Sequence, residues 1–227
     1  MSKVFSVAID GPVGAGKSCV AKKVAERLNA AYLDTGAMYR AVGLYMLENG
    51  VPLEDSAAIA ENAGKARVDV RYEGREQRTY LNGRDVTGEL RRPEVSLASS
   101  AVAKVHAVRE ALVNRQRELA RGISLVMDGR DIGTCVLTDA TLKIFLTATP
   151  EERARRRFRQ MNGRGGQSFE DVLNDLIRRD RNDMSRAESP LRCAEDAVEL
   201  DSTSLTEDEV VERIVSLLME RTGGERA

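Results

Sequence analysis

The sequence predicts an α/β fold of three layers, in which helices cover both faces of a five-stranded parallel sheet. Three observations support this prediction. A glycine-rich motif at residues 11–18 joins an apolar run, Val4 to Ile9, to a helical pattern. Four more short apolar runs follow and alternate with helical patterns, as in sheets whose parallel strands are linked by helices. The 227 residues suffice for one such domain with a small insertion, so we expect a single domain over residues 1–227.

The motif at residues 11–18 has the Gly-x4-Gly-Lys-Ser spacing of a phosphate-binding loop (P-loop). Glycines let the backbone bend around an anion with its N–H groups pointing inward, at the positive end of the helix that starts near Lys17. We therefore expect a nucleoside triphosphate site here, and an ordinary βα turn is the alternative. The residues expected to bind the triphosphate are Gly11, Pro12, Val13, Gly14, Ala15, Gly16, Lys17, Ser18 and Cys19.

Composition excludes several classes of protein. With 35 basic and 36 acidic side chains, the net charge of −1 argues against nucleic-acid binding. Cys19, Cys135 and Cys193 are odd in number and far apart, which argues against a disulfide framework or a zinc site. The single histidine, His106, has no partner motif. Because no apolar run is long enough for a membrane span, we expect a cytoplasmic protein without a membrane partner. No heptad pattern indicates assembly, so we expect a monomer.

The helix after the phosphate loop has an apolar stripe with residues four apart. These residues are Val20, Val24 and Leu28. Residues 31–33 form the second predicted strand, and Asp34 or Thr35 caps the helix that follows it. Since this helix starts at a strand end, we expect Thr35, Tyr39 and Arg40 to lie near the mouth of the phosphate loop. Core packing is an equally good explanation of Tyr39.

The sequence changes character over residues 68–87, where apolar and polar residues alternate and Asn82-Gly83 is a strong hairpin signal. An antiparallel sheet in the middle of a βα alternation indicates a small insert, which we place within residues 50–90. A long helical stretch follows over residues 93–121, with a break in its middle left open. Ser100 and Arg109 lie on or near this stretch.

Three further buried strands are predicted at residues 123–127, 142–146 and 197–200. The first of them ends in Asp128-Gly129-Arg130-Asp131. Open α/β sheets bind ligands at the carboxyl ends of their strands, so this cluster is the second candidate for a functional site. A solvated turn is the alternative.

An arginine-rich helix follows the capping box at residues 149–152. Its arginines, together with one in the segment that ends it, are Arg153, Arg155, Arg156, Arg157, Arg159 and Arg164. A glycine-rich break at residues 162–166 and a helix capped by Ser168 come next. We predict that residues 153–168 form a helical lid over the triphosphate, and a solvated charged hairpin is the alternative.

The returning helix carries Arg179, Asp183 and Arg186 at spacings of four and three, so the three side chains share one face. That face either points into the cleft or forms a ladder of surface ion pairs. A last helix begins at a capping box of Thr206 and Glu209.

A phosphate loop alone leaves three classes of protein open: a kinase of a small acceptor, a regulatory GTPase and a motor or transport ATPase. The guanine-reading motif Asn-Lys-x-Asp or Thr-Lys-x-Asp is absent from the sequence, which argues against the GTPase. The acidic residues after the strand at 123–127 are interleaved with Gly129 and Arg130. This arrangement resembles acceptor binding more than the acidic pair of an ATPase.

Five motifs occur in an order that resembles the bacterial cytidylate, or (d)CMP, kinases of the nucleoside monophosphate kinase superfamily. They are GPVGAGKS at 11–18, DTGAMYR at 34–40, DGRDIG at 128–133, the segment 179–186, and LDST at 200–203. The match runs from about Val4 to Leu218. The resemblance implies a P-loop fold with an antiparallel insert in the monophosphate-binding region.

The resemblance also implies roles for individual residues. Contacts to cytosine match Ser100, Arg109 and Asp131, since the N4 amino group of cytosine needs an acceptor while O2 and N3 need a donor. Contacts to the pentose match Arg179 and Asp183. Contacts to the acceptor phosphate match Arg40, Arg130 and Arg186, which would place three guanidinium groups around one dianion. Thr35, Tyr39 and Asp128 complete the implied substrate-binding set.

The implied reaction transfers the γ-phosphoryl group of ATP to CMP or dCMP with Mg²⁺ as cofactor. Lys17 would bridge the β- and γ-phosphates, and Ser18 would hold the metal. Arg153 and Arg157, with Arg130, would neutralise charge in the transition state. Asp128 would support the metal through water or stabilise the turn. Alternatives are a kinase for UMP, AMP or shikimate, and a non-catalytic nucleotide-binding module.

Overall fold

The computed structural model describes residues 4–161 and 167–223. The chain divides into two compact units: the first comprises Met1–Ala31 and Gly122–Ala227, and the second comprises Tyr32–Arg121. The two units are described in turn. No helix in the described ranges has the length and the apolar character that crossing a membrane requires. The single domain with its internal borders stays a prediction.

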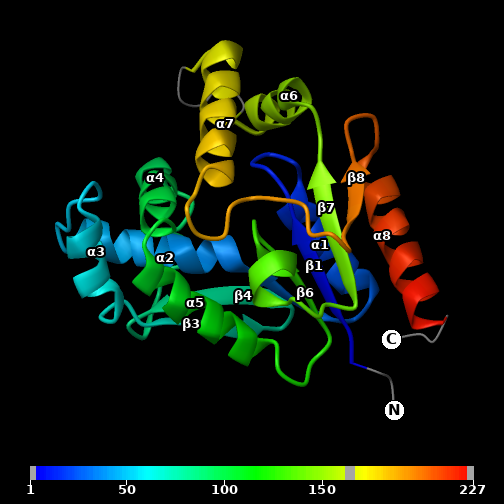
Figure 1. Ribbon diagram of the computed structural model, residues 1–227, viewed down its shortest axis with the longest axis horizontal. Coiled ribbons are helices and arrows are strands. Elements are labelled where there is room, and N and C mark those ends of the chain that lie inside the picture. Colours follow the sequence, from blue (N-terminus) through cyan, green and yellow to red (C-terminus); the bar gives the residue numbers. More distant parts are fainter. Residues whose placement is uncertain (1–3, 162–166, 224–227) are drawn as a thin grey trace. The chain divides into compact units, whose positions relative to one another are not determined.

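A five-stranded sheet with the strand order β2-β6-β1-β7-β8 confirms the predicted parallel sheet. Its strands are β1 (Ser6–Asp10), β2 (Ala31–Asp34), β6 (Leu125–Asp128), β7 (Leu142–Thr147) and β8 (Val198–Asp201). β1 lies between β6 and β7 (Figure 1), and its Val7 pairs with Val126 on one side and Leu142 on the other. Because all strands run the same way, Asp10 and Asp128 end neighbouring strands at the same edge.

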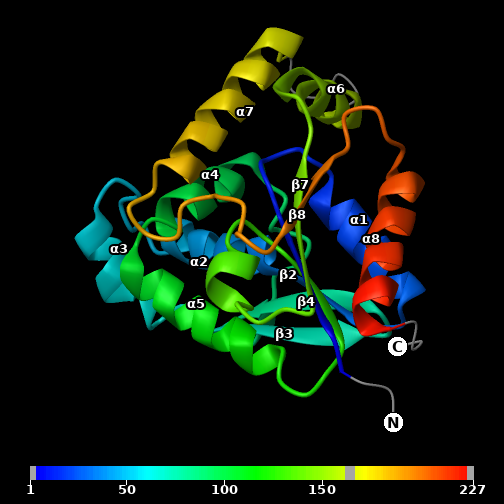
Figure 2. The ribbon, with the colours of Figure 1, turned by 45° about the vertical axis from the view of Figure 1, so that its right-hand side comes forward.

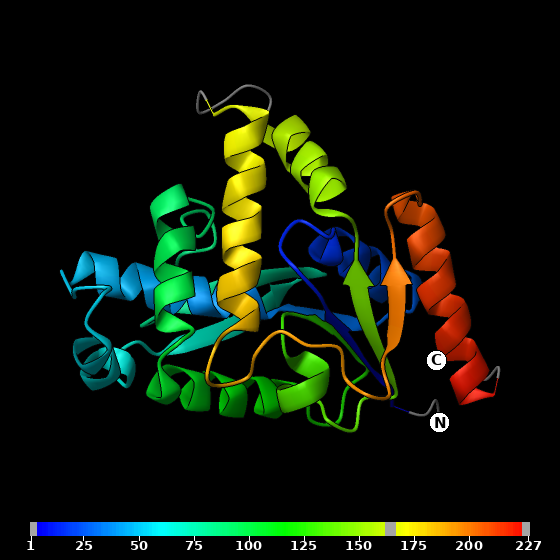
Figure 3. The same cartoon turned by 45° about the horizontal axis from the view of Figure 1, so that its top comes forward.

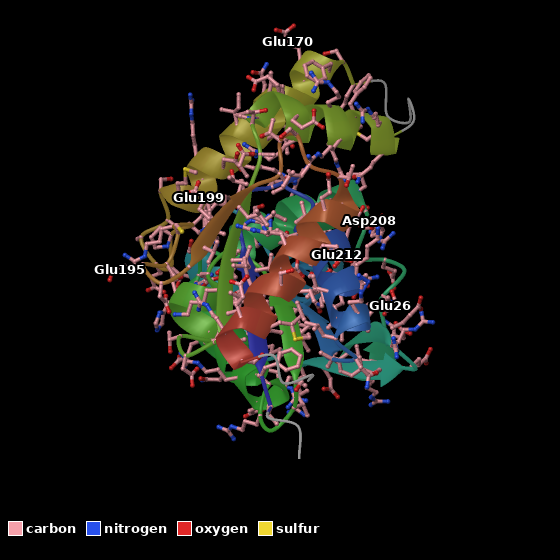
Figure 4. All side chains as sticks on the ribbon, turned by 90° about the vertical axis from the view of Figure 1, so that its right-hand side faces the viewer. Glu26, Glu170, Glu195, Glu199, Asp208 and Glu212 are labelled. Atoms are coloured by element: carbon pink, nitrogen blue, oxygen red, sulfur yellow. The ribbon has the colours of Figure 1, made fainter. Side chains whose placement is uncertain are left out.

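The helices of the first unit are α1 (Lys17–Arg27), the π-helix η1 (Ile132–Val136), α6 (Pro150–Met161), α7 (Phe169–Met184) and α8 (Glu207–Thr222). α1 and α8 lie side by side (Figures 1 and 2). Figure 4 labels Asp208 and Glu212 on α8 and Glu26 on α1. Lys23 Nζ donates to Asp208 at 2.9 Å, and Arg27 pairs with Glu212. These exposed ion pairs add little free energy, so the apolar stripe of α1 is the main reason for its packing.

Two of the three predicted capping boxes of this unit are complete. Ser168 caps α7 and Thr206 caps α8, each with an acidic residue three positions later that bonds back to the cap. At α6 only half of the box forms: Thr149 Oγ1 accepts from the Glu152 N–H at 3.3 Å. The Thr149 N–H donates instead to Thr203 Oγ1 at 3.0 Å. The Glu152 carboxylate forms ion pairs with Arg155 and Arg156 instead of bonding back to the Thr149 N–H.

α6 and α7 form a helical hairpin (Figure 3). Ala154, Val172 and Leu176 make a buried apolar cluster between them, and Val13 of the phosphate loop packs against this cluster. Phe158 and Phe169 meet edge to face with ring centroids 6.2 Å apart. Both helices were expected at these positions. The predicted lid at 153–168 includes residues 162–166, which lie outside the described residues, and Arg164 is among them.

The second unit contains the predicted antiparallel insert as a three-stranded sheet with the order β3-β4-β5. Its strands are β3 (Val68–Glu73), β4 (Glu76–Leu81) and β5 (Arg84–Asp85). The two-residue turn predicted at Asn82-Gly83 is confirmed, since Leu81 pairs with Arg84 and both turn residues have positive φ, 49° and 85°.

The helices of the second unit are α2 (Thr35–Glu48), α3 (Ser56–Ala63), α4 (Pro93–Val102) and α5 (His106–Leu119). Asp34 caps α2 by accepting from the Ala37 N–H at 2.9 Å. The helical stretch predicted over 93–121, for which a break in the middle was left open, is two helices, α4 and α5, separated by residues 103–105. α4 packs closely on α2, because a Cβ on Gly43 would come within 2.9 Å of the Ser99 nitrogen.

Candidate active site

The phosphate loop lies between β1 and α1, as its sequence predicts. Gly11, Gly14 and Gly16 have φ values of 148°, 78° and 89°, which L-residues rarely adopt. A Cβ on Gly11 would also lie 2.0 Å from the Leu146 carbonyl oxygen of β7. The positive φ values and the close approach to β7 explain why glycine is required at these positions. α1 begins at Lys17, so the N–H groups of its first turn are available to an anion.

Lys17 is buried at the start of α1, and its Nζ donates to the Pro12 carbonyl oxygen at 2.7 Å. Burial, and next the charge of Arg130, lower the pKa of Lys17 to about 7, against opposing contributions from Asp128, Asp10 and Asp183. The ammonium group therefore lies among both cations and carboxylates. An incoming anion would relieve the burial cost and restore a higher pKa.

Ser18 and Asp128 form an oxygen-rich pair next to Lys17. The Ser18 hydroxyl donates to Asp128 Oδ2 at 2.8 Å, and Asp128 is buried. Magnesium prefers oxygen ligands and usually takes only one or two from the protein, the rest coming from water and substrate phosphates. A hydroxyl beside a buried carboxylate at a phosphate loop fits that requirement. The described residues contain no group of three or more acidic, histidine or cysteine side chains suited to a metal.

Asp10 at the end of β1 was not predicted as a site residue. Its carboxylate is buried and accepts from the backbone N–H groups of Ile132 and Gly133 at 2.8 and 2.7 Å. Burial raises its pKa to about 6, and the two backbone hydrogen bonds oppose that rise. Asp10 thereby fixes the backbone that directly follows Asp131. Its position at the end of a buried strand is the same signal that identified Asp128.

Three of the predicted acceptor-site residues come together at the carboxyl end of β6 and α7. Asp183 Oδ2 accepts from Arg130 Nε at 2.9 Å, and Asp183 Oδ1 accepts from Arg186 Nη2 at 2.8 Å. Arg186 Nε is buried and makes no hydrogen bond within residues 4–161 and 167–223. One carboxylate thus holds two guanidinium groups together, an arrangement suited to a doubly charged phosphate. Asp131, next to Arg130, is buried as well.

Arg179 lies on the same helix but pairs elsewhere. Its Nε lies 3.4 Å from Asp175 Oδ2, one turn earlier on α7. The two arginines on the face predicted from this spacing therefore pair with different carboxylates: Arg179 with Asp175, and Arg186 with Asp183.

The two arginines expected to act on the transferred phosphoryl group differ in surroundings. Arg153 is buried: Nε donates to the Ala148 carbonyl oxygen at 2.9 Å, and Nη1 donates to Val13 O at 2.8 Å and to Asp180 Oδ2 at 2.6 Å. Arg157 is exposed. Arg156, one of the arginines named on this helix but given no role from the sequence, donates to Ser202 Oγ at 3.0 Å, and its Nη1 lies 4.0 Å from the place of a Cβ on Gly16.

The second unit carries the remaining predicted residues. Thr35 is buried in the first turn of α2, and Arg40 Nη2 donates to Asp34 Oδ2 at 2.8 Å. The Arg109 guanidinium on α5 lies 5.8 Å from the centroid of the Tyr39 ring, a cation–π contact. Ser100, half-buried, lies on α4, the helix that packs against α2. Within this unit the structure thus pairs Tyr39 with Arg109.

Comparison with known proteins identifies the family. A sequence model described as cytidylate kinase matches residues 7–220. The cytidylate kinase of Desulforamulus reducens is 52% identical over 217 residues, which cover 95% of this chain and 97% of that protein. The cytidylate kinase of Caldanaerobacter subterraneus subsp. tengcongensis is 49% identical over 220 residues, with 96% of each chain covered.

A crystal structure of an uncharacterized protein from Eubacterium ventriosum has a TM-score of 0.50 and 14% identity, and covers 94% of this chain and 98% of its own. This likeness concerns the fold alone. The family model and the relatives at about half identity extend over almost all of the sequence. The chain belongs to the cytidylate kinase family.

Proposed function

We propose that this protein transfers the γ-phosphoryl group of ATP to CMP, and to dCMP, giving ADP and CDP or dCDP. The observation that carries the proposal lies within the first unit. The buried Lys17 of the phosphate loop interacts electrostatically with Arg130 and Asp183, and Asp183 in turn binds Arg186. A triphosphate-binding loop and a pair of arginines suited to a second phosphate therefore share one edge of the sheet. We further propose that the protein acts as a monomer in the cytoplasm.

The proposed roles follow from charge and hydrogen bonding. Lys17 and the N–H groups of the loop bind the β- and γ-phosphates, while Arg130, Arg186 and Arg40 bind the phosphate of CMP. The second pKa of a phosphate monoester is about 6, so the attacking oxygen is ionised at neutral pH and needs no general base. Ser18, which donates to Asp128, would hold Mg²⁺, and the metal would supply charge neutralisation on the phosphates. Arg153 and Arg157 are proposed to stabilise the charge that develops during transfer.

Recognition of the nucleoside is assigned to the remaining residues. Asp131 and Ser100 accept from the N4 amino group of cytosine, and Arg109 donates to O2 and N3. Arg179 and Asp183 bind the pentose. Thr35 and Tyr39 lie on the same helix as Arg40 and complete the set.

One assay tests this function against its alternatives. Production of ADP from ATP and Mg²⁺ is measured with CMP, dCMP, UMP, AMP or shikimate as the acceptor, one at a time. We expect turnover with CMP and dCMP that exceeds turnover with the other acceptors at least about 100-fold, the size of discrimination that paired polar groups provide. Equal turnover with UMP, or turnover with AMP or shikimate alone, would support another small-acceptor kinase. Binding of ATP without any turnover would identify a non-catalytic module.

The lowered pKa of Lys17 predicts proton uptake on ATP binding. In the free protein the pKa is about 7, so at pH 8 most Lys17 side chains are neutral. Phosphates favour the ammonium form and raise this pKa, so binding at pH 8 takes up close to one proton. The affinity for ATP should therefore fall as the pH rises above 7.

Calorimetric titration of ATP at pH 8 in two buffers of different ionisation enthalpy measures this uptake. The phosphates of ATP are already ionised at that pH. Lys17→Met serves as the control and should show no uptake. Binding of ATP to the unaltered protein without proton uptake would contradict the prediction.

A further inference from the structure

Both peptide groups of Val13 in the phosphate loop are held by one buried ion pair. The Val13 N–H donates to Asp180 Oδ1 at 3.2 Å, and the Val13 carbonyl oxygen accepts from Arg153 Nη1 at 2.8 Å. Arg153 Nη1 also donates to Asp180 Oδ2 at 2.6 Å. The side chains of Arg153 and Asp180 are only 5% and 10% exposed. The loop, α6 and α7 are thus joined by a closed ring of hydrogen bonds.

Apolar packing reinforces the same junction. The Val13 side chain packs against the cluster of Ala154, Val172 and Leu176 between α6 and α7. The backbone of Gly14 approaches α6 so closely that an added Cβ would lie 3.3 Å from the Arg153 Cβ. The loop therefore contacts the helical hairpin through hydrogen bonds and through packing.

Asp180 lies on the same face of α7 as Asp183. Asp183 lies three residues later on α7 and holds Arg130 and Arg186. One rigid helix thus carries two carboxylates, one bound to the phosphate loop and one bound to the arginines assigned to the acceptor phosphate. A shift of the loop relative to α7 changes the distance between the two phosphate sites.

Arg153 is oriented by the same contacts. Its Nε donates to the Ala148 carbonyl oxygen, and its Nη1 donates to Val13 and Asp180. Asp180 therefore helps to fix the orientation of this guanidinium. Removing the charge of Asp180 would leave Arg153 buried without its counter-ion, a costly state that the side chain would relieve by moving.

We infer that Asp180 is a positioning residue: through Arg153 and Val13 it sets the phosphate loop in register with α7, and so sets the transferred phosphoryl group against the acceptor phosphate. The inference rests on the proposed function. Phosphoryl transfer depends mainly on alignment and charge, so an error in this register lowers the rate even when both nucleotides bind.

The first test is Asp180→Asn, which keeps the shape of the side chain and an acceptor for the Val13 N–H but removes the ion pair. We expect kcat to fall about tenfold or more and KM for ATP to rise about tenfold, while KM for CMP changes less than about twofold. Glu170→Gln, an exposed residue on the same helix, is the matched control and should behave as the unaltered protein. Unchanged kcat and KM for ATP in Asp180→Asn would overturn the inference.

A second variant separates positioning from stability. Replacing a buried ion pair by apolar residues of similar volume is often neutral or stabilising, so Arg153→Met combined with Asp180→Leu should retain the thermal midpoint. We expect its kcat to stay at least about tenfold below that of the unaltered protein, because the Val13 peptide is no longer held and the charge of Arg153 is absent. Recovery of normal turnover in this folded double variant would show that the pair serves stability alone.

The proposed function and the inference fail in different ways. A lack of CMP-dependent ADP production in the unaltered protein would refute the function. The effect of Asp180→Asn on the loop would still appear as weaker ATP binding by calorimetry. Normal turnover of CMP together with unaltered ATP binding in Asp180→Asn would refute the inference alone.

Discussion

Replacement of Lys17 by methionine is expected to lower kcat for CMP phosphorylation by about 10³-fold or more, while the dissociation constant of CMP stays within about threefold. The buried ammonium group of Lys17 is the positive charge of the loop. Its Nζ donates to the Pro12 carbonyl oxygen at 2.7 Å. Methionine fills a similar volume without the charge, so the loss measures charge stabilisation and not a cavity.

The measurement combines steady-state rates with calorimetric binding of CMP. Lys23→Ala, which removes an exposed lysine from the same helix, is the control and should keep kcat within about twofold, as expected for a surface ion pair. Parallel loss of turnover and CMP binding in Lys17→Met would indicate a disturbed fold. Retention of most of the turnover would remove Lys17 from the proposed mechanism.

Replacement of Asp131 by alanine should reduce the preference for CMP over UMP, expressed as the ratio of kcat/KM values, by about 100-fold. Asp131 is buried three residues beyond the end of β6, where its neighbours Ile132 and Gly133 are fixed by Asp10. UMP has a carbonyl in place of the N4 amino group and offers the carboxylate no donor at that position, which costs free energy that CMP avoids. Alanine removes this difference.

The same rates measured for Asp139→Ala, an exposed residue further along the chain, provide the control. Its ratio should not change. An unchanged ratio in Asp131→Ala would contradict the assignment of this residue to the base, whatever happens to the absolute rates.

The sequence predicted the strands of the large sheet because strands buried on both faces are continuous apolar runs. Val7, Ala8 and Ile9 are fully buried, and the runs at β6 and β7 are similar. The turn at Asn82-Gly83 was also predictable, since positive φ at two successive positions restricts the residue types. A break between α4 and α5 was left open by the sequence, and its position could not be fixed, because Ala103-Lys104-Val105 contains neither glycine nor proline.

The residues that hold the site in place were harder to predict than the residues assigned to the substrates. Arg130, Asp183 and Arg186 could be named from motif and spacing, and the structure brings them together. Asp10 bonds to residues more than 120 positions away, and Asp180 bonds to Val13, 167 positions away. Such contacts depend on which strands are neighbours and on how a returning helix packs. A local pattern of residues contains neither kind of information.

The chain leaves the first unit after Ala31 and re-enters it at Gly122, at positions that lie close together. Ala31 and Ser124 belong to that unit, and the Ala31 N–H donates to the Ser124 carbonyl oxygen at 3.0 Å. The residues after β2, 35–121, are therefore an excursion that leaves and returns at neighbouring strands, β2 and β6. The entropy of closing such an excursion grows only with the logarithm of its length, by about 0.6 kcal/mol for each doubling. Segments of different lengths can thus be accommodated at this point at little cost to the folding of the unit that holds the phosphate loop.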